Sequence, residues 1–384
     1  MLDKKSIATP SYVINKKNLE KNMQIFKYII DNTNAKILLS QKAFSNYFLY
    51  PFMGNYLSGT SSSGLYEARL GYEEMKDREV HVCSPAYTEN EISELVEICD
   101  HIVFNTPIQW LKYKKIISNS KKEIHCGIRI NPEYSEIKNP LYDPCSRYSR
   151  LGSTILQLMQ YDEELFENED GNNIDGIHFH TLCEHSLDTL ERTLSVIENK
   201  FDKYLKKIKW INMGGGHYIT KSNYDIQGLI NLLNSFEKKY NLQIYLEPGE
   251  AIALNCGYLI CTVLEIMNNE MNIAIVDTSA TCHMPNIIEV PFQPSIENAG
   301  LLNEKKYNYR IGGISCLAGD IIGDYSFDYK LNTGDKLILD DMIVYSMVKN
   351  NTFNGVPLPS IAIEDDGGTK IIKSFDYHDF KTRL

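Results

Sequence analysis

A lysine that follows an apolar run of strand length is the residue around which chemistry can be arranged in this chain. The run Ile37-Leu38-Leu39 ends shortly before Lys42. An amine fixed at the end of a buried strand can attack a carbonyl group and so hold a cofactor as a Schiff base. The alternative is that Lys42 only ends the strand with a solvated charge. The residues at the ends of the other predicted strands favour the first interpretation.

Lys42 lies at the end of the first of eight predicted strands that alternate with helices. The predicted strands are Ile37–Leu39, Gly59–Ser62, Val80–Cys83, Ile102–Phe104, Ile124–Ile130, Ile174–Phe179, Ile211–Met213 and Ile244–Leu246. The predicted helices are Lys16–Ile30, Leu65–Leu70, Glu89–Ile98, Ile108–Ile117, Leu187–Phe201 and Ile226–Tyr240. This alternation predicts an α/β fold, a (β/α)₈ barrel of the TIM type.

After Pro248 the rhythm changes to strands without intervening helices. The predicted strands are Leu259–Ile266, Ile273–Asp277, Tyr307–Ile311, Lys336–Leu339 and Ser360–Ile363. We therefore predict a barrel domain over residues 15–250 and an all-β C-terminal domain, a sandwich or barrel, over residues 251–384. A short N-terminal strand over residues 8–14 is expected to join the second domain.

Composition excludes several classes of protein. The 384 residues carry a formal net charge of -11, which argues against nucleic acid as a partner and is compatible with a cationic substrate. No apolar stretch is long enough to cross a bilayer, and the stretch Met1–Ser6 lacks the apolar core of a secretion signal. The nine cysteines form no Cys-x-x-Cys pair, which is typical of reduced thiols and predicts a cytoplasmic protein.

Polar, ionisable or small residues follow every predicted barrel strand. They are Lys42, Ser61-Ser62-Ser63, Ser84, Asn105, Arg129, His180, Gly214-Gly215-Gly216 and Glu247. Active sites of TIM barrels lie at the carboxyl ends of the strands. The sequence therefore predicts that these residues converge on one site.

Three of these strand ends suit a flat, phosphorylated cofactor. The glycines at 214–216 permit positive φ and close backbone approach, so their loop can bind phosphate, although a tight turn is the alternative. Glu247 is held by Pro248 and Gly249 and can pair with a protonated pyridine nitrogen; its alternative is a turn-capping acid. A neutral His180 can stack on the ring.

Two histidines on one face of a strand keep a metal site open. His178 and His180, with Glu184 or His185, could bind zinc in a barrel hydrolase. No clear third and fourth ligand follows a strand end, so we predict no metal, and His178 can be a buried histidine without a role. In the β-domain, Cys316 lies in a glycine-flanked loop, which favours a chemical role over burial.

With these residues, the chain resembles the fold-type III, alanine-racemase-like, pyridoxal-phosphate decarboxylases over nearly its whole length. The resemblance implies pyridoxal 5'-phosphate as cofactor, with Lys42 as its Schiff-base lysine and the glycines as its phosphate loop. It implies that Glu247 binds the ring nitrogen and His180 stacks on the ring. Arg129, the run Ser149-Arg150-Leu151-Gly152 and a phosphate-holding Tyr345 also lie at family positions.

The same resemblance implies a homodimer with shared active sites, because the matching catalytic cysteine, Cys316, reaches the partner's site in the family. Two departures resemble the carboxynorspermidine/carboxyspermidine decarboxylase branch. Glu250 replaces the arginine that ends the Glu-Pro-Gly motif, and Leu182-Cys183-Glu184 replaces a Gly-Ser pair. The departure at Glu250 leaves open which group neutralises the phosphate.

The resemblance implies decarboxylation of carboxyspermidine or carboxynorspermidine to spermidine or norspermidine, a step of polyamine biosynthesis. Acids are expected to bind the cationic amines of such a substrate: Glu184, Glu250, Asp320 and Glu289. The alternatives are a diaminopimelate or other basic amino-acid decarboxylase, a non-catalytic pyridoxal-phosphate carrier, and the metal-dependent hydrolase. The sequence does not separate the two polyamine substrates, which differ by one methylene.

Overall fold

The computed structural model describes residues 6–167 and 173–384, which form two compact units. The barrel unit is Asn22–Ile252, and the sheet unit combines Met1–Lys21 with Ala253–Leu384. The sequence-based boundary between residues 250 and 251 lies close to the boundary between Ile252 and Ala253. Met1–Lys5, on which the expectation about a secretion signal largely rests, lie outside the described residues.

The barrel unit contains a closed barrel of eight parallel strands in sequential order, which confirms the predicted TIM-type fold. Each predicted strand overlaps one of these eight. Their bounds are β2 (Lys36–Ser40), β3 (Gly59–Ser62), β4 (Glu79–Cys83), β5 (His101–Phe104), β6 (His125–Arg129), β7 (Gly176–His178), β8 (Trp210–Asn212) and β9 (Gln243–Leu246).

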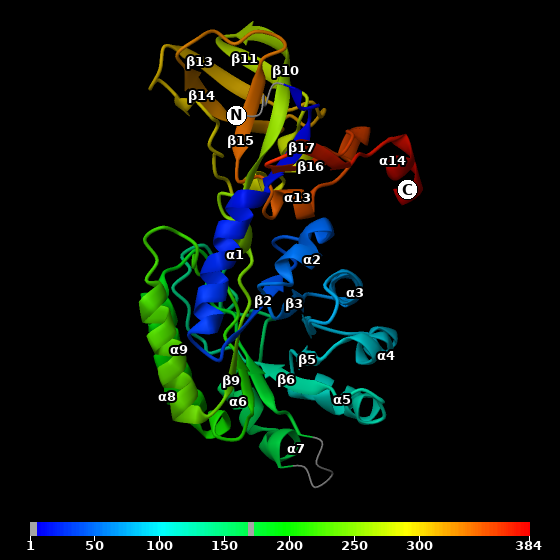
Figure 1. The fold of residues 1–384 in the computed structure, drawn as a ribbon, viewed down its shortest axis with the longest axis vertical. Coiled ribbons are helices and arrows are strands. Elements are labelled where there is room, and N and C mark those ends of the chain that lie inside the picture. The colour runs from blue at the N-terminus through cyan, green and yellow to red at the C-terminus, as the bar shows by residue number, and fades with distance from the viewer. Residues whose placement is uncertain (1–5, 168–172) are drawn as a thin grey trace. The chain divides into compact units, whose positions relative to one another are not determined.

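Helices connect the barrel strands, and each predicted helix is present (Figure 1). Figure 1 shows α3, α4 and α5 in succession along one side of the barrel and α8 and α9 along another. The helices are α1 (Lys16–Asp31), η2 (Tyr47–Leu49), α2 (Tyr50–Met53), α3 (Leu65–Glu74), α4 (Glu89–Ile98), α5 (Pro107–Ser118), α6 (Ile155–Met159), α7 (Asp162–Phe166), α8 (Leu187–Leu205), α9 (Ile226–Tyr240) and α10 (Glu250–Ala253).

The starts of these helices follow from capping chemistry. Thr88 and Glu91 form a reciprocal capping box at the start of α4. Thr106 caps α5, whose first residue is Pro107. Such caps satisfy N–H groups that have no partner in the first turn. The observed bounds of α4 are the same as those predicted, Glu89–Ile98.

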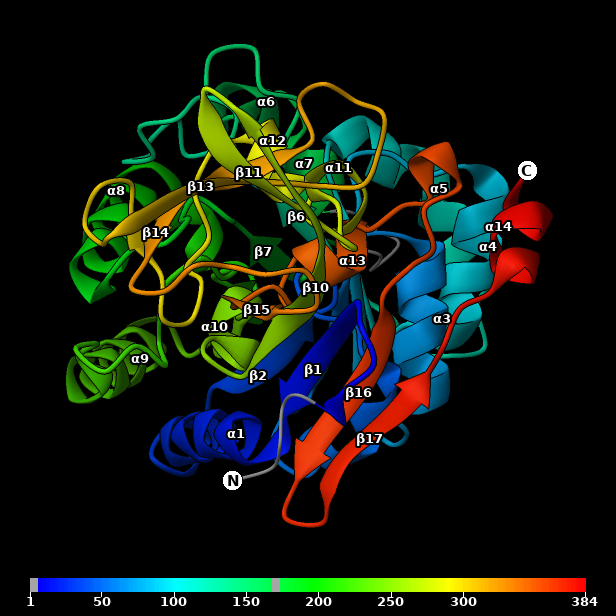
Figure 2. The same cartoon turned by 90° about the horizontal axis from the view of Figure 1, so that it is seen from above.

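The sheet unit is built on one mixed nine-stranded sheet in the order β12-β14-β13-β11-β10-β1-β16-β17, with β15 also paired to β10. Figure 2 shows β1, β16 and β17 side by side. The strands are β1 (Ser11–Asn15), β10 (Gly257–Asn269), β11 (Met271–Val276), β12 (Gly300–Leu301), β13 (Tyr307–Gly312), β14 (Ile321–Phe327), β15 (Lys336–Asp340), β16 (Ser360–Asp365) and β17 (Gly368–Lys373). Short helices accompany them: α11 (Ala280–His283), α12 (Asn286–Glu289), α13 (Ser346–Lys349), η3 (Phe353–Gly355) and α14 (Tyr377–Arg383).

The β-character of this region is confirmed, and all five strands predicted after Pro248 are present. The N-terminal strand lies inside the sheet, antiparallel to β10 and parallel to β16. Strands β12, β14 and β17 were not predicted. The last of them, Gly-Thr-Lys-Ile-Ile-Lys, pairs only with β16 among the described residues. Its sequence does not alternate between apolar and polar residues, so the pattern does not predict a strand. Backbone pairing with β16 holds this segment in the sheet.

One tryptophan fills the amino-terminal end of the barrel. A Cβ atom at Gly176 would lie 1.8 Å from Trp210 Cε2, and one at Gly127 would lie 2.4 Å from Trp210 Cη2. Gly176 belongs to β7, the strand beside β8, which carries Trp210, and Gly127 belongs to β6, the next strand beyond β7. The indole therefore occupies the space of two absent side chains.

We predict that Gly176→Ala lowers the free energy of unfolding by about 1–3 kcal/mol, because the added methyl overpacks a filled interior. Urea denaturation would measure the change. The matched control is Gly319→Ala, where a Cβ meets no atom within 4 Å. Equal stabilities of the two variants would contradict the close fit around Trp210.

Candidate active site

A small cavity at the carboxyl ends of the barrel strands brings together most of the predicted barrel residues. Of the predicted strand ends, the serines, Lys42, Arg129, His180 and Glu247 line it, and the glycine loop adjoins Glu247 and His180. The lining is Ser40, Lys42, Ser61, Ser62, Ser63, Cys83, Arg129, His178, His180 and Glu247. The expected convergence of these strand ends is therefore observed within the barrel unit.

Lys42 projects from a turn that is fixed on both sides. The Gln41 amide donates to Ser62 Oγ and to the Glu67 carbonyl, both at 2.8 Å, and Gln41 Oε1 accepts from Tyr50 at 2.9 Å. The Lys42 side chain remains accessible to solvent. Its pKa is lowered, first by desolvation among protein atoms and then by the charge of Arg129. A lower pKa increases the neutral, nucleophilic fraction of the amine.

Glu247 is anchored as an anion at the floor of the cavity. Its Oε1 accepts from Asn212 Nδ2 at 2.7 Å, and its Oε2 lies 3.3 Å from His178 Nε2. Burial alone would raise the pKa of Glu247. The charge of His178 and hydrogen bonds from His178, Ser61 and Asn212 instead hold this pKa well below the ordinary value.

The glycine loop has the backbone freedom that its sequence requires. Gly214 and Gly216 adopt φ values of +66° and +91°. A Cβ at Gly215 would lie 2.0 Å from the Glu247 carbonyl oxygen. Side chains at these positions would be strained or would collide, so the loop presents bare backbone at the cavity.

His180 is held as a neutral ring beside this loop. Its Nδ1 accepts from the Gly215 N–H at 3.4 Å. Desolvation and the charges of Lys42 and Arg129 keep the pKa of His180 well below its ordinary value. An uncharged imidazole is the form that packs against a flat ring without repelling the neighbouring cations.

Glu250 forms part of an acidic cluster that also contains an unpredicted tyrosine. The Tyr218 hydroxyl donates to Glu250 Oε1 at 3.0 Å. Burial and the charges of Glu250 and Glu184 raise the pKa of Tyr218 far above its usual range. The same two acids and Lys42 act on Cys183, so the cluster lies within electrostatic reach of Lys42. Glu184 has a φ of 59°, a conformation that costs energy and is often found at functional sites.

Other unpredicted residues support the same site. Cys83, the last residue of β4, lines the cavity, and Ser84, the residue after it, does not. Successive side chains of a strand point to opposite faces, so only one of the two can face the cavity. Ser84 instead donates its hydroxyl to the Ala86 carbonyl. Asn105 positions the run before Gly152: its amide donates to the Arg150 carbonyl and accepts from the Gly152 N–H, both at 2.7 Å.

The sheet unit carries the remaining predicted residues. Cys316 is exposed, and its N–H donates to Asn354 Oδ1 at 2.9 Å. Tyr345 has a φ of 54° at the start of α13. Glu289 pairs with Lys349. These residues flank loops and short helices, the parts of a fold that sequence patterns define least well.

The carboxylate of Asp320, predicted to bind substrate, has partners within the sheet unit. Its side chain is buried, and its oxygens accept from Ser279 Oγ at 2.9 Å, Thr281 N–H at 3.2 Å and Ser315 N–H at 2.9 Å. A carboxylate used in this way has little capacity left for an external ammonium group. Asp320 instead fixes the loop that carries Cys316.

Among the described residues, His178 and His180 direct their ring nitrogens to other partners and are not arranged as zinc ligands. One ring nitrogen of His178 faces Cys83 and the other faces Glu247, and His180 accepts from the glycine loop. A different group, Glu79, His81 and His101, has its ligand atoms within 4.8 Å of one another at the opposite end of the barrel. A larger cavity of about 460 Å³ adjoins Glu79 and His101 there.

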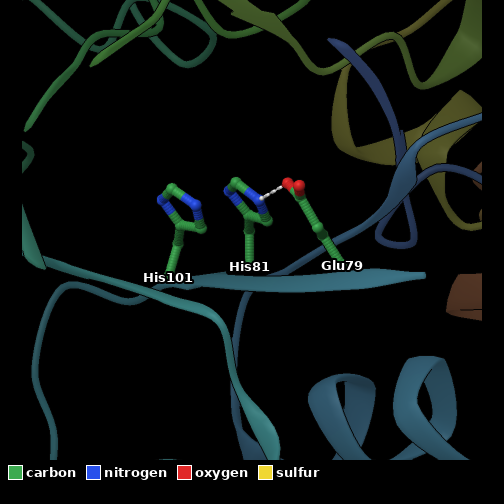
Figure 3. Close-up of side chains that lie close together, drawn as sticks. All are labelled: Glu79, His81 and His101. Carbon is green, nitrogen blue, oxygen red and sulfur yellow. Dashed lines mark hydrogen bonds and ion pairs between the residues drawn. The ribbon is translucent and has the colours of Figure 1, made fainter. Parts of the chain in front are cut away.

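This second group is arranged as a stack. Figure 3 shows His81 between His101 and Glu79, with a hydrogen bond from His81 to Glu79. The two rings are nearly parallel, 8° apart, with centroids separated by 3.9 Å. Lone pairs in parallel ring planes do not converge on one ion, and Lys36 already pairs with Glu79. The group packs the amino-terminal end of the barrel.

Comparison with known proteins agrees with this geometry. The profile described as "Pyridoxal-dependent decarboxylase, C-terminal sheet domain" matches residues 11–343. The chain belongs to the pyridoxal-dependent decarboxylase family. Its members are carboxy-lyases, so this protein is an enzyme of that class.

Individual relatives lie in one part of this family. Carboxynorspermidine/carboxyspermidine decarboxylase of Campylobacter jejuni is 42% identical, covering 98% of each chain. Carboxyaminopropylagmatine decarboxylase of Synechocystis is 37% identical, covering 99% of this chain and 96% of the relative. The crystal structure of Campylobacter jejuni carboxynorspermidine decarboxylase complexed with norspermidine has a TM-score of 0.89 at 40% identity and covers 98% of this chain and 100% of that one. No described helix of the present protein has the length and apolarity needed to cross a membrane.

The stacked group at the barrel's amino-terminal end predicts a pH effect on stability. Burial would raise the pKa of Glu79, but the hydrogen bonds and charges of His81 and Lys36 lower it from 4.5 to about 2. The unfolded chain therefore binds the proton more tightly. The stabilisation by Glu79 is present above 4.5 and is lost as the pH falls toward about 2.

We expect Glu79→Gln to be less stable than the wild type near neutral pH, and this difference to shrink between about pH 5 and pH 3. Urea denaturation across that range would measure it. Glu97→Gln, at an exposed position on α4, is the control that should follow the wild type. A constant gap between wild type and Glu79→Gln would contradict the assigned ion pairs.

Proposed function

We propose that this protein decarboxylates carboxynorspermidine or carboxyspermidine, giving norspermidine or spermidine. The observation that carries the proposal is the 42% identity, over nearly all of both chains, to an enzyme of that name. The acidic cluster of Glu184, Tyr218 and Glu250 supports it. A triamine substrate carries distal ammonium groups, for which carboxylates are suitable partners.

The residues of the cavity fit pyridoxal 5'-phosphate as cofactor. Lys42 would hold it covalently, and the bare backbone of Gly214–Gly216 would hold its phosphate. The family resemblance adds Tyr345 as an expected phosphate contact. Glu247 would accept a hydrogen bond from the ring nitrogen, and His180 would cover one ring face. Arg129, whose charge reaches Lys42 and His180, adds positive potential. When bound, pyridoxal phosphate accepts the electron pair left by the departing carboxylate.

The side chains of the protein would then determine the charge around the cofactor and the positions of the protons. The ionised Glu247 would favour protonation of the ring nitrogen, because a buried anion stabilises a neighbouring cation. The neutral His180 adds no opposing charge. Cys316 Sγ of the second subunit would return one proton to the substrate carbon that loses carbon dioxide. Lys42 Nζ would release the product amine. Since no disulfide joins the nine cysteines, we expect a cytoplasmic enzyme.

Carbon dioxide release from a panel of pure substrates tests the proposal. We expect turnover of one or both carboxylated triamines and little turnover of diaminopimelate. Glu250→Gln and Glu184→Gln should each raise KM about 10-fold or more, the usual effect of losing a charged hydrogen bond. Glu191→Gln, exposed on α8, should leave KM unchanged. Turnover of diaminopimelate alone would refute the proposed substrate.

A second candidate substrate is carboxyaminopropylagmatine. The 37% identity to a decarboxylase of that name, over 99% of this chain, favours including it. The same panel separates it from the triamines, because both compounds are assayed under one set of conditions. Preference for the agmatine derivative by more than about 10-fold in kcat/KM would replace the triamine assignment.

We also propose a homodimer with shared active sites, in which Cys316 completes the partner's site. Lys42→Ala and Cys316→Ala are each expected to be inactive as pure dimers. When the two variants exchange subunits at random, about a quarter of wild-type activity should return, because half of the dimers carry one intact site of two. Exchange verified by mass spectrometry without recovery would exclude a shared site.

A further inference from the structure

A cysteine, a histidine and a glutamate lie in a row across the floor of the candidate site. Cys83 ends β4, His178 ends β7 and Glu247 follows β9. Cys83 Sγ lies 4.0 Å from His178 Nδ1, and His178 Nε2 lies 3.3 Å from Glu247 Oε2. The side chain of His178 is only 3% exposed. Both of its nitrogens therefore face an acid, and the ring bridges two strand ends.

The protons of this row follow from the groups around it. Glu247 already accepts from Asn212 and is ionised, so His178 Nε2 must carry the proton that faces it. The other nitrogen either accepts the Cys83 S–H or donates to a Cys83 thiolate. The second arrangement alternates negative, positive and negative charge along the row, and each buried charge then has an opposite neighbour.

Neighbouring charges favour that second arrangement. Burial would lower the pKa of His178, but the charges of Cys83 and Glu247 and hydrogen bonds to both raise it to about 9. Burial would raise the pKa of the Cys83 thiol, but His178 and then Arg129 lower it. Lys42 and Arg129 contribute positive charge to the same floor, and His180 is neutral.

We propose that Cys83 and His178 form a buried thiolate–imidazolium pair, and that His178 is a positioning residue that holds the Glu247 carboxylate as an oriented anion. Cys83 acts through His178 by keeping the imidazole charged. The functional half of this inference rests on the proposed role of Glu247 at the cofactor's ring nitrogen. The ion pair itself is a property of the protein without cofactor.

Ultraviolet absorbance of the thiolate near 240 nm tests the ion pair directly. The signal is the difference between wild type and Cys83→Ala, titrated from about pH 5 to pH 9 in cofactor-free protein. We expect a Cys83 thiolate at neutral pH in the wild type. In His178→Gln the midpoint should rise by at least about one unit, which lowers the thiolate fraction about tenfold at a pH below both midpoints.

Two controls separate this result from a general loss of structure. Cys183→Ala, which removes a thiol whose pKa is raised to about 11 by burial and by the charges of Glu184 and Glu250, should leave the neutral-pH signal unchanged. Thermal unfolding of His178→Gln shows whether it folds. An ordinary thiol midpoint in the wild type, or no change in His178→Gln, would overturn the ion pair.

Affinity for added pyridoxal phosphate tests the positioning role. We expect His178→Gln to raise Kd about tenfold or more and Cys83→Ala to raise it by less, while the double variant matches His178→Gln because Cys83 acts only through His178. Additive effects of the two substitutions on Kd would refute the proposal that Cys83 acts only through His178. A wild type that shows the thiolate but binds no pyridoxal phosphate would instead refute the proposed cofactor and leave the ion pair intact.

Discussion

Closure of the barrel by its first and last strands is the constraint on which the site depends. In the parallel pairing of β2 with β9, Lys36 lies opposite Tyr245 and Ile37 opposite Leu246. The Ser40 N–H donates to the Pro248 carbonyl at 3.1 Å just beyond the paired strands. This pairing of β2 with β9 brings the turn with Lys42 beside the turn with Glu247, although the two residues lie at opposite ends of the barrel sequence. A shift of register would separate the amine from the acid.

Much of this arrangement could be predicted because regular patterns carry it. Buried parallel strands give short apolar runs, and the residues just after them share one rim, so Lys42, Arg129, His180 and Glu247 could be grouped without coordinates. Pairing partners within the site are different. The contacts of His178 with Cys83 and Glu247 join three strands, and no local sequence feature records which way each ring nitrogen points.

The acidic residues also divide into those that sequence patterns identify and those whose contacts depend on the tertiary structure. Glu250 could be recognised as a departure in a motif, but its partner Tyr218 lies on another loop and has no sequence signal of its own. Asp320 is grouped with the substrate-binding acids in the sequence analysis because an acid near a cysteine in a glycine-rich loop suggests an exposed site. The backbone of that loop instead folds around the carboxylate and uses its oxygens. Burial of a single polar residue depends on tertiary contacts that composition does not reveal.

Charge is distributed unevenly over the barrel unit's proposed site, and this bears on how a phosphate is held. Lys42 and Arg129 oppose the anionic floor, whereas Glu184 and Glu250 add negative charge to the cluster with Tyr218. Acids near a phosphate loop weaken phosphate binding, so the amide groups of the glycine loop gain importance in this branch. The same acids suit a cationic substrate.

The close fit of Trp210 between two glycines gives the molecule a built-in optical probe. The chain has two tryptophans, and Trp110 lies in α5. The Trp210 indole donates to Asp175 at 3.0 Å and meets the His101 ring edge-on at 4.8 Å. Imidazole groups and nearby charges alter indole emission, so its fluorescence reports on the end of the barrel remote from the candidate active site. With Trp110 replaced by phenylalanine, emission would follow opening of that end separately from events at the site.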